Sequence, residues 1–267
     1  MLKSGLSRII AITNQKGGVG KTTTAINLAA ALAASDIKVL LIDSDPQGNS
    51  TSGLGIQKTE GLATMYDVLV EGKPVSECIC HTEMEGLDLL PADKNLIGGN
   101  LDLVDVEKRE CVLQGQLKAI HDEYAFILID CPPALDLLTL NALIAADSVL
   151  IPIQCEFFAL ESVSGLMDTI DRVRESFDHP IQIEGILLTM FDDRTNLTRQ
   201  VAADLREFFK DEVFKTVIPR SVRLAEAPSH GKPILLYDPG SKGSEAYIQL
   251  AKEVLANAQK RSAKSAR

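Results

Sequence analysis

Short runs of apolar residues alternate with segments of helical periodicity along the whole chain. The apolar runs are nearly continuous, which is typical of strands that are buried on both faces. They predict strands over residues 8–13, 39–43, 87–91, 126–130, 148–153, 183–189 and 216–218. Apolar residues spaced three and four apart predict helices over residues 21–34, 62–71, 96–121, 137–145, 159–176, 197–210 and 244–258. This order predicts an α/β fold, with a mostly parallel twisted sheet and helices on both faces.

No repeat, low-complexity tract or linker divides the chain. We therefore expect one domain over residues 1–258, followed by a short tail over residues 259–267. The tail carries four basic side chains and no acidic one, and we expect it to be disordered.

The segment between the first predicted strand and the first predicted helix is rich in glycine. Residues 14–24 read N-Q-K-G-G-V-G-K-T-T-T. A strand, a glycine loop and a helix in this order form a phosphate-binding loop, because the helix N-terminus and successive backbone N–H groups converge on one anion. Lys21 would then supply positive charge to the β- and γ-phosphates, and the Thr22 hydroxyl would bind Mg²⁺.

Acidic residues end two of the predicted strands. Asp43 and Asp45 follow the strand over residues 39–43 within the string D-S-D-P-Q-G-N, and Asp130 ends the strand over residues 126–130. The carboxyl edge of an open α/β sheet is where ligands bind, so these acids are candidates for the chemistry of a nucleotide. Asp130 resembles a carboxylate that holds Mg²⁺ through water. A single aspartate at a strand end is more often a cap or turn residue, but three beside a phosphate loop favour a catalytic site.

Composition fits such an enzyme and excludes several other classes. The chain has 267 residues, 45% of them hydrophobic, and a net charge of −10. No apolar stretch reaches the roughly 18 residues needed to span a bilayer. The N-terminal segment contains too few apolar residues for a signal peptide. The spacing of the five cysteines fits neither a zinc site nor a disulfide framework, so we expect reduced and mostly buried thiols: Cys78, Cys80, Cys111, Cys131 and Cys155.

The glycine loop departs from the general pattern G-x-x-x-x-G-K-[ST] at two positions. Gln15 replaces the leading glycine, and a second lysine, Lys16, precedes the glycine pair. The string K-G-G-x-G-K-T-T resembles the deviant Walker A loop of the ParA/MinD family of ATPases. The resemblance implies a P-loop NTPase fold, with ATP and Mg²⁺ as cofactors. It also implies that Lys16 reaches across an ATP-bound homodimer to the phosphates of the other subunit.

The same resemblance assigns roles to individual residues. Asp45, which precedes the proline of the Asp-x-Asp-Pro string, would orient the attacking water, with Lys16 and Lys21 as the other catalytic residues. Asp43 would support Lys21, Thr22 or a water bound to Mg²⁺, so the expected metal site contains Thr22, Asp130 and Asp43. Residues 130–136 would form a switch that senses the γ-phosphate. The expected nucleotide contacts are Gln15, Lys16, Gly17, Gly18, Val19, Gly20, Lys21, Thr22 and Thr23, with Met190 and Pro219 from the later strands.

Residues 217–234, together with N-Q and D-P-Q-G-N, resemble the ParA/Soj branch of partition ATPases. That branch implies non-specific binding to double-stranded DNA, a ParB-like centromere-binding partner, and a cytoplasmic, nucleoid-associated location. Residues 191–234 contain eight basic and seven acidic residues, so charge alone favours an ordinary solvated surface. The resemblance favours DNA contacts instead, with the candidate residues Arg194, Arg199, Arg220 and Arg223.

Other functions remain open at this point. A related ATPase could position another cargo, such as a chemoreceptor cluster or a microcompartment. A reductase-type ATPase would need two cysteines at an iron–sulfur cluster, but neither Cys111 nor Cys131 lies in a matching motif. A membrane-binding MinD-like protein would need large apolar residues in a C-terminal helix, and no Leu, Ile, Phe or Trp follows Leu255. Only thirteen residues precede the glycine loop, so we expect no helix-turn-helix domain.

Overall fold

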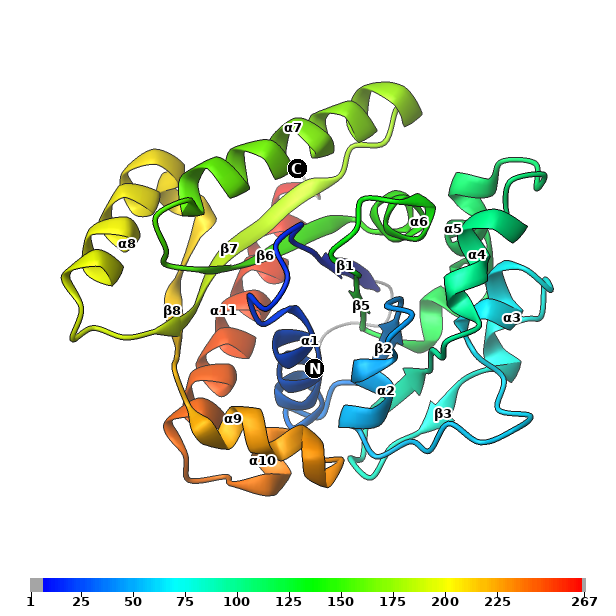
Figure 1. Cartoon of the computed structure of the whole chain (residues 1–267), viewed down its shortest axis with the longest axis horizontal. Coiled ribbons are helices and arrows are strands. Elements are labelled where there is room, and N and C mark those ends of the chain that lie inside the picture. The colour runs from blue at the N-terminus through cyan, green and yellow to red at the C-terminus, as the bar shows by residue number, and fades with distance from the viewer. Residues whose placement is uncertain (1–6, 266–267) are drawn as a thin grey trace.

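A computed structural model describes residues 7–265, with side chains through Arg261. Eight strands form one sheet in the order β3-β4-β2-β5-β1-β6-β7-β8 (Figure 1). The strands are β1 (Arg8–Ile12), β2 (Val39–Asp43), β3 (Cys80–His81), β4 (Leu87–Leu90), β5 (Phe126–Asp130), β6 (Ser148–Gln154), β7 (Gln182–Phe191) and β8 (Val213–Pro219). Every neighbouring pair is parallel except β3 and β4, so the predicted mostly parallel sheet is confirmed.

The helices between these strands cover both faces of the sheet. They are α1 (Lys21–Ala33), α2 (Asn49–Gly53), α3 (Met65–Leu69), α4 (Leu96–Asp102), α5 (Val112–Leu117), α6 (Leu137–Ala145), α7 (Ala159–Phe177), α8 (Asn196–Phe209), α9 (Val222–Glu226), α10 (Ile234–Tyr237) and α11 (Lys242–Ser265). Short 3₁₀ turns complete the connections: η1 (Val75–Glu77), η2 (Arg109–Cys111), η3 (His121–Glu123), η4 (Lys210–Glu212) and η5 (Ala227–His230). Within residues 7–265, no helix is long and apolar enough to cross a membrane.

Alternate residues of the central strands feed two separate hydrophobic cores. Ile9 and Ala11 of β1 pack into the core under α3 to α8, whereas Ile10 and Ile12 pack into the core under α1 and α9 to α11. Figure 1 shows α6 and α7 on one side of the sheet and α1 and α10 on the other. Because both faces are covered, the strands must be apolar at every position, which explains their continuous apolar runs.

The predicted helix over residues 96–121 is wrong. The chain instead forms α4, a turn over residues 103–108, the 3₁₀ turn η2, and α5. Hydrogen bonds from Val104 N to the Leu101 carbonyl and from Val106 N to the Leu103 carbonyl have the i→i+3 spacing of turns, at 3.1 Å each. Lys108 then adopts a φ of +53°, a left-handed conformation that an α-helix cannot contain. Apolar periodicity alone did not reveal this interruption.

Helix α11 continues past the expected domain boundary at residue 258. It extends to Ser265, so part of the segment we expected to be a disordered tail is helical, and residues 266–267 lie outside the described part of the chain. Arg261 explains the extension, because its guanidinium donates to the Ile183 carbonyl at 2.7 Å and to the buried Glu184 carboxylate at 3.2 Å. These bonds attach the end of the helix to β7.

Candidate active site

The glycine-rich loop joins β1 to α1 and depends on two glycines with positive φ. Gly18 and Gly20 have φ angles of +76° and +89°, a region that residues with a Cβ rarely adopt. Val19, between them, is buried, and its carbonyl accepts a hydrogen bond of 2.7 Å from Thr189 Oγ1 in β7. Gly17 and Gly18 stay exposed. The loop is therefore held against the sheet by Val19, with its glycines on the accessible side.

The start of the loop is anchored by the buried Asn14 side chain. Its Nδ2 donates to the Pro152 carbonyl at 2.8 Å, and its Oδ1 accepts from Lys16 N at 2.9 Å. Gln15, by contrast, is exposed, and its amide donates to Thr169 Oγ1 of α7 at 3.4 Å. Asn14 thus gives the Asn-Gln start of the motif a structural function that sequence reasoning did not assign.

Lys21 begins α1, with its side chain buried beneath the glycine loop. Its Nζ donates to the Lys16 carbonyl at 3.2 Å, which holds the ammonium inside the loop. Burial lowers the pKa of Lys21 below its usual value, and neighbouring negative charges, above all Asp130, oppose that effect. A partly desolvated cation in this position is suited to neutralise the phosphate groups of a nucleotide.

Asp43 and Asp130 lie side by side on adjacent strands. They are register partners of β2 and β5, and both side chains are fully buried. Asp43 Oδ2 accepts from Thr51 N at 2.8 Å and from Thr51 Oγ1 at 2.7 Å, and its Oδ1 accepts from Asp45 N at 3.2 Å. Asp43 therefore fastens α2 and the following loop to the sheet, and its part in metal binding stays a prediction.

Asp130 has an unused acceptor in the same place. Its Oδ2 accepts from Ser50 Oγ at 2.7 Å, whereas its Oδ1 is buried with no hydrogen-bond partner in the described structure. Burial, followed by the charge of Asp43, raises the pKa of Asp130 to about 8, although the hydroxyls of Ser50 and Thr22 act in the opposite direction. A free carboxylate oxygen near a threonine hydroxyl is a donor set that fits Mg²⁺, which prefers oxygen ligands.

No group of three or more His, Cys, Asp or Glu residues forms a metal cage in residues 7–265. Mg²⁺ is usually bound by one or two carboxylates that act together with water and substrate phosphates. Thr22 and Asp130 are therefore the residues that would hold the metal, with Asp43 behind them.

A cavity of about 310 Å³ brings the predicted motifs together. Asp45 lies on its wall, and the Asp45 Oδ1 accepts from Gln47 N at 2.9 Å. The residues that line the cavity are Gly17, Gly18, Gly20, Lys21, Thr22, Thr23, Asp45, Asn49 and Pro133. The phosphate loop, the Asp-x-Asp-Pro string and the predicted switch thus meet in one place, as their positions at the carboxyl ends of β1, β2 and β5 require.

Lys16 points to a different partner. Its Nζ forms a salt bridge with the carboxylate of Glu156, in the loop after β6, and both side chains are about half exposed. Lys16 does not line the 310 Å³ cavity in its own subunit. The two lysines of the loop therefore lie in different environments, one buried beneath the glycines and one on the surface.

Met190 and Pro219 lie at the carboxyl ends of β7 and β8, where Phe191 and Pro219 are register partners. Met190 has a φ of +47°, which is rare for a residue with a side chain. Neither residue lines the phosphate cavity, so their contact with the adenine stays a prediction.

Two polar residues of α2 complete the site and were missed in the sequence. The Ser50 hydroxyl donates to Asp130, and the Thr51 hydroxyl donates to Asp43. One short helix therefore supplies hydrogen bonds to both aspartates. The switch segment has its own anchor: Asp136 caps α6 by accepting from the amides of Leu138 and Thr139. The only sequence signal for α2 was a run of small polar residues after the Asp-x-Asp-Pro string.

The sheet order, the glycine loop at a helix N-terminus, and the acids around one phosphate-sized cavity together define a P-loop nucleoside triphosphatase. A family profile described as "AAA domain" matches residues 7–183. Soj of Bacillus subtilis, described as a sporulation initiation inhibitor protein, is 55% identical over 252 residues, or 94% of this chain and 100% of that protein.

The chromosome partitioning protein ParA of Caulobacter vibrioides is 53% identical over 261 residues, or 97% of this chain and 98% of the relative. Among solved structures, cobyrinic acid a,c-diamide synthase of Mycobacterium smegmatis, with bound ATP analog and magnesium, superposes with a TM-score of 0.83. It shares 34% identity and covers 98% of both chains. The chain belongs to the ParA/Soj family of partitioning ATPases, within the deviant Walker A group, and its cofactors are ATP and Mg²⁺.

Replacing Asp130 with Asn should stabilise the nucleotide-free protein at about pH 8, because it removes one of two buried, adjacent carboxylates. The pKa values of Asp43 and Asp130 in the folded state, about 6 and about 8, lie above the unfolded value of 3.8. The folded state therefore binds more protons, and the free energy of unfolding should fall as the pH rises from about 4 to about 8.

The Asp130→Asn variant should show a shallower fall, which urea denaturation at about pH 5 and about pH 8 measures. Asp105→Asn, on an exposed turn, is the matched control and should keep the wild-type slope. An unchanged slope in Asp130→Asn would show that the buried pair does not control the pH dependence.

Proposed function

We propose that this partitioning ATPase closes into a homodimer when it binds ATP, and that the dimer binds double-stranded DNA without sequence specificity. Hydrolysis, stimulated by a ParB-like protein bound at a centromere, then releases the dimer from the nucleoid. The main support is the cavity that brings Lys21, Thr22 and Asp45 together, in a chain 55% identical to Soj. On this proposal the protein acts in the cytoplasm and on no membrane.

The roles of the residues in hydrolysis follow from where their charges lie. Phosphoryl transfer depends on positioning and on neutralisation of charge more than on covalent chemistry. When bound, Mg²⁺ supplies positive charge to the β- and γ-phosphates. Lys21 and the glycine N–H groups hold the phosphates, while Asp45, which lines the same cavity, orients the attacking water. Asp43 keeps the Asp45 loop in place through the hydrogen bond to Asp45 N.

Asp45→Ala should retain ATP binding and lose hydrolysis, since the carboxylate positions water and does not hold phosphate. Removal of a positioning or general-base group of this kind typically costs a factor of about 10² to 10⁴ in rate. Phosphate release and the affinity for a fluorescent ATP analogue measure the two effects separately. The variant should accumulate as an ATP-bound dimer, and a wild-type rate of hydrolysis would remove Asp45 from the mechanism.

Lys16 is proposed to act on the phosphates of the partner subunit. In the single chain its ammonium is held by Glu156, so dimerisation must break this salt bridge before Lys16 can cross the interface. An exposed salt bridge is worth little, at about 0 to 1 kcal/mol, so the charge of a bound triphosphate can readily compete for the lysine. The pair is therefore compatible with a lysine that changes partner.

Lys21→Ala and Lys16→Ala should fail at different steps. Lys21→Ala should lose nucleotide binding by the monomer, because Lys21 neutralises phosphates within its own subunit. Lys16→Ala should bind ATP as a monomer yet remain monomeric. Size-exclusion chromatography with light scattering, with and without ATP, makes the comparison, and normal dimerisation of Lys16→Ala would refute the cross-subunit role.

The four arginines proposed to contact DNA lie at the β8 end of the sheet, but in different surroundings. Arg194 is paired with Asp192, and Arg223 is paired with Glu226 and Asp238. Arg199 donates to the neutral Asn196 side chain, and no salt bridge of the described structure involves Arg199 or Arg220. Arg199 and Arg220 therefore carry the less compensated charges and are the better candidates for phosphate contacts.

Replacing Arg199 or Arg220 with Glu should weaken binding to all DNA sequences alike, and Arg194→Glu and Arg223→Glu should do so less. Each lost phosphate contact should lower the dependence of affinity on salt by about one counterion per subunit. Fluorescence anisotropy with two unrelated duplexes across a salt series measures both effects in the ATP-bound state.

Lys118→Glu makes the same change of charge on an exposed position beside α5, at the opposite end of the sheet, and is the control. ATP affinity must be checked in parallel, because Arg220 directly follows Pro219 and its loss could act through the nucleotide. If none of the four variants weakens DNA binding more than Lys118→Glu does, the DNA surface lies elsewhere.

A different cargo, such as a chemoreceptor cluster or a microcompartment, is the alternative within the family, and the name of the relative at 53% identity, a chromosome partitioning protein, favours chromosomes. The reductase-type alternative gains no support. Cys131 is fully buried and donates its thiol hydrogen to the Ile129 carbonyl, and Cys111 packs against the core beneath α5. These surroundings do not present two cysteines at a subunit surface.

A further inference from the structure

The carboxylate of Asp45, which is proposed to orient the attacking water, belongs to a short turn. Residues 45–48 read D-P-Q-G, and Asp at the first position, Pro at the second and Gly at the fourth are typical of a β-turn. Gly48 N donates to the Asp45 carbonyl at 2.8 Å, and Gln47 N donates to Asp45 Oδ1 at 2.9 Å. The position of the carboxylate therefore depends on the backbone of Gln47.

Gln47 is the residue of this turn whose backbone its own chemistry does not restrict. The ring of Pro46 fixes the φ angle of that residue at about −65°. Gly48 has a φ of +60°, in the left-handed region that favours glycine. Gln47 has neither restriction and its side chain is exposed, so a contact from another segment is needed to hold it.

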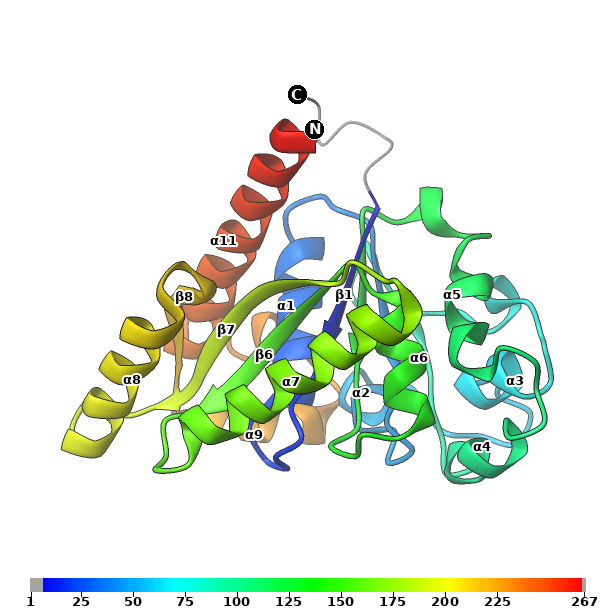
Figure 2. The same cartoon turned by 90° about the horizontal axis from the view of Figure 1, so that it is seen from above.

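The turn borders two cavities on the side of the molecule toward which β1 and β6 point, where α2 and α4 also lie (Figure 2). Asp45 lines the phosphate cavity of about 310 Å³. A second cavity, of about 470 Å³, is lined by Pro46, Gln47, Lys58, Asp93, Lys94 and Ile97. Lys58 does not line the phosphate cavity, so it meets the turn from outside the nucleotide site.

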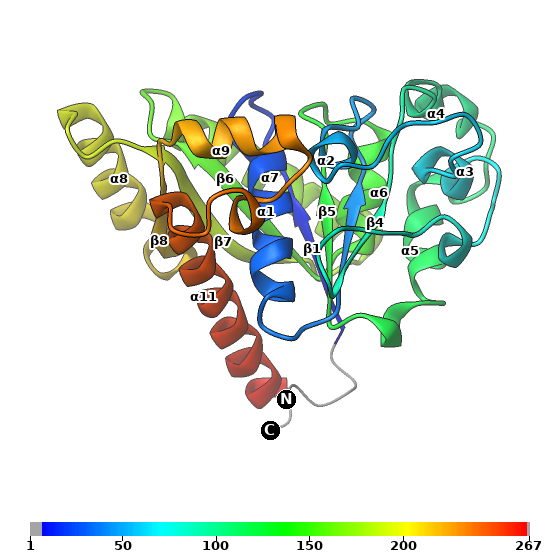
Figure 3. The same ribbon diagram turned by 90° about the horizontal axis from the view of Figure 1, so that it is seen from below.

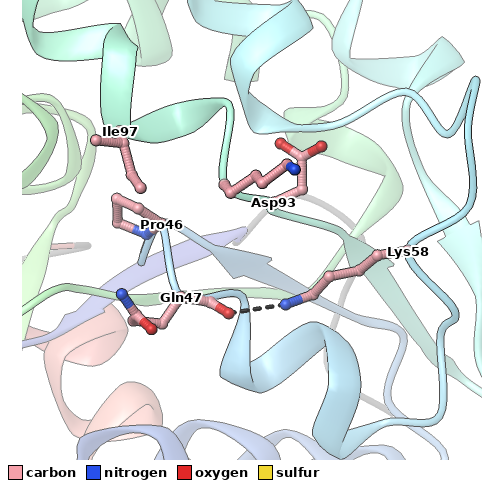
Figure 4. Close-up of a pocket in the computed structure, with 6 residues that line it drawn as sticks. Pro46, Gln47, Lys58, Asp93 and Ile97 are labelled. Atoms are coloured by element: carbon pink, nitrogen blue, oxygen red, sulfur yellow. Dashed lines mark hydrogen bonds between the residues drawn. The ribbon is translucent and has the colours of Figure 1, made fainter.

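Lys58 provides the contact that Gln47 needs. It lies in the connection between α2 and α3, and its Nζ donates to the Gln47 carbonyl at 2.7 Å (Figure 4). A Cβ at Gly48 would clash with the Lys58 amine and would lie 2.7 Å from Lys58 Cε. The end of the lysine therefore occupies the space that glycine leaves open, and a larger residue at position 48 would displace it.

We propose that Lys58 is a positioning residue for ATP hydrolysis, which holds the Gln47 carbonyl and thereby keeps Gln47 N directed at Asp45. Both contacts depend on the backbone angles of one residue, Gln47, so the loss of one weakens the other. Without Lys58 the carboxylate spends less time in the orientation that the attacking water requires. The consequence for hydrolysis rests on the proposed role of Asp45, whereas the hold of Lys58 on the turn does not.

Lys94 is a matched control within the same cavity. Both lysines are exposed and both line the 470 Å³ cavity. The ammonium of Lys94, however, makes no hydrogen bond or salt bridge with the residues that the structure describes. An effect of positive charge in the cavity would be shared by the two lysines, whereas an effect of the bond to Gln47 belongs to Lys58 alone.

Steady-state ATP hydrolysis by the full-length protein separates the two effects. Lys58→Met removes the donor but keeps an unbranched side chain, and it should lower kcat by about five- to tenfold, as the loss of one charged hydrogen bond predicts. The affinity for a fluorescent ATP analogue should stay within about twofold of the wild-type value. Lys58→Arg keeps a charged donor and should recover most of the lost rate, and Lys94→Met should keep the wild-type kcat within about twofold.

Several results of this comparison would overturn the proposal. A wild-type kcat in Lys58→Met would show that hydrolysis does not need the bond, and equal losses in Lys58→Met and Lys94→Met would show an effect of charge alone. A loss in Lys58→Arg as large as in Lys58→Met would show that the donor is not what matters. Light scattering with ATP accompanies the assay, because failure of Lys58→Met to dimerise would assign Lys58 to the subunit interface. Thermal unfolding checks the fold of each variant, and both lysines are exposed.

Hydrogen exchange in the nucleotide-free protein measures the hold on the turn without hydrolysis. Lys58→Met should speed exchange of the Gln47 and Gly48 amides by about threefold or more, and Lys94→Met should leave it unchanged. Unchanged exchange in Lys58→Met, together with an inactive Asp45→Ala, would overturn the inference about Lys58 and leave the proposed function intact. Faster exchange together with a wild-type rate of hydrolysis in Asp45→Ala would overturn the proposed role of Asp45 and leave the hold of Lys58 on the turn supported.

Discussion

Two buried carboxylates at the ends of adjacent strands are the constraint on which this site depends. Asp43 and Asp130 are register partners in the middle of a sheet that is covered on both faces. Burial raises the pKa values of both side chains, and the charge of Asp43 adds to the rise at Asp130. Hydrogen bonds offset the cost of burying these carboxylates only in part. Thr51 donates to Asp43, whereas one oxygen of Asp130 has no hydrogen-bond partner in the described structure. The site is thus arranged for a cation that the protein alone does not supply.

The loops that follow these two aspartates both line the 310 Å³ cavity, and each is attached to other parts of the molecule. The loop after β2 leads to α2, which returns to both acids through Ser50 and Thr51. The loop after β5 ends at Asp136, which is bonded to α4 through Asn100. A change in charge at the phosphates therefore has short, hydrogen-bonded routes to surfaces on α2 and α4.

Acidic and basic residues are unevenly distributed along the chain, which the net charge alone does not show. The chain as a whole has a net charge of −10, yet the region from β7 to α10 is almost balanced, and α4 lies at the opposite end of the sheet (Figure 3).

Much of the architecture and the phosphate site could be predicted from the sequence, because both depend on local patterns. Continuous apolar runs indicated strands buried on both faces, and a glycine loop between a strand and a helix has few other uses. The positions of Lys21, Asp45 and Asp130 followed from one rule, that parallel strands end at the same edge of a sheet. These features need only the order of residues and the topology of the sheet.

Other features were decided by contacts between distant segments. The break at residues 103–108 has no proline or glycine to announce it, and the apolar residues around it remain periodic although most of them face solvent. The salt bridge of Lys16 with Glu156 and the bond of Asn100 with Asp136 join residues 140 and 36 positions apart. The sequence by itself determined the sheet and its phosphate loop, because these follow from backbone geometry and local hydrophobicity. Only the tertiary structure decided which polar side chains meet, because such pairs form after the chain has packed.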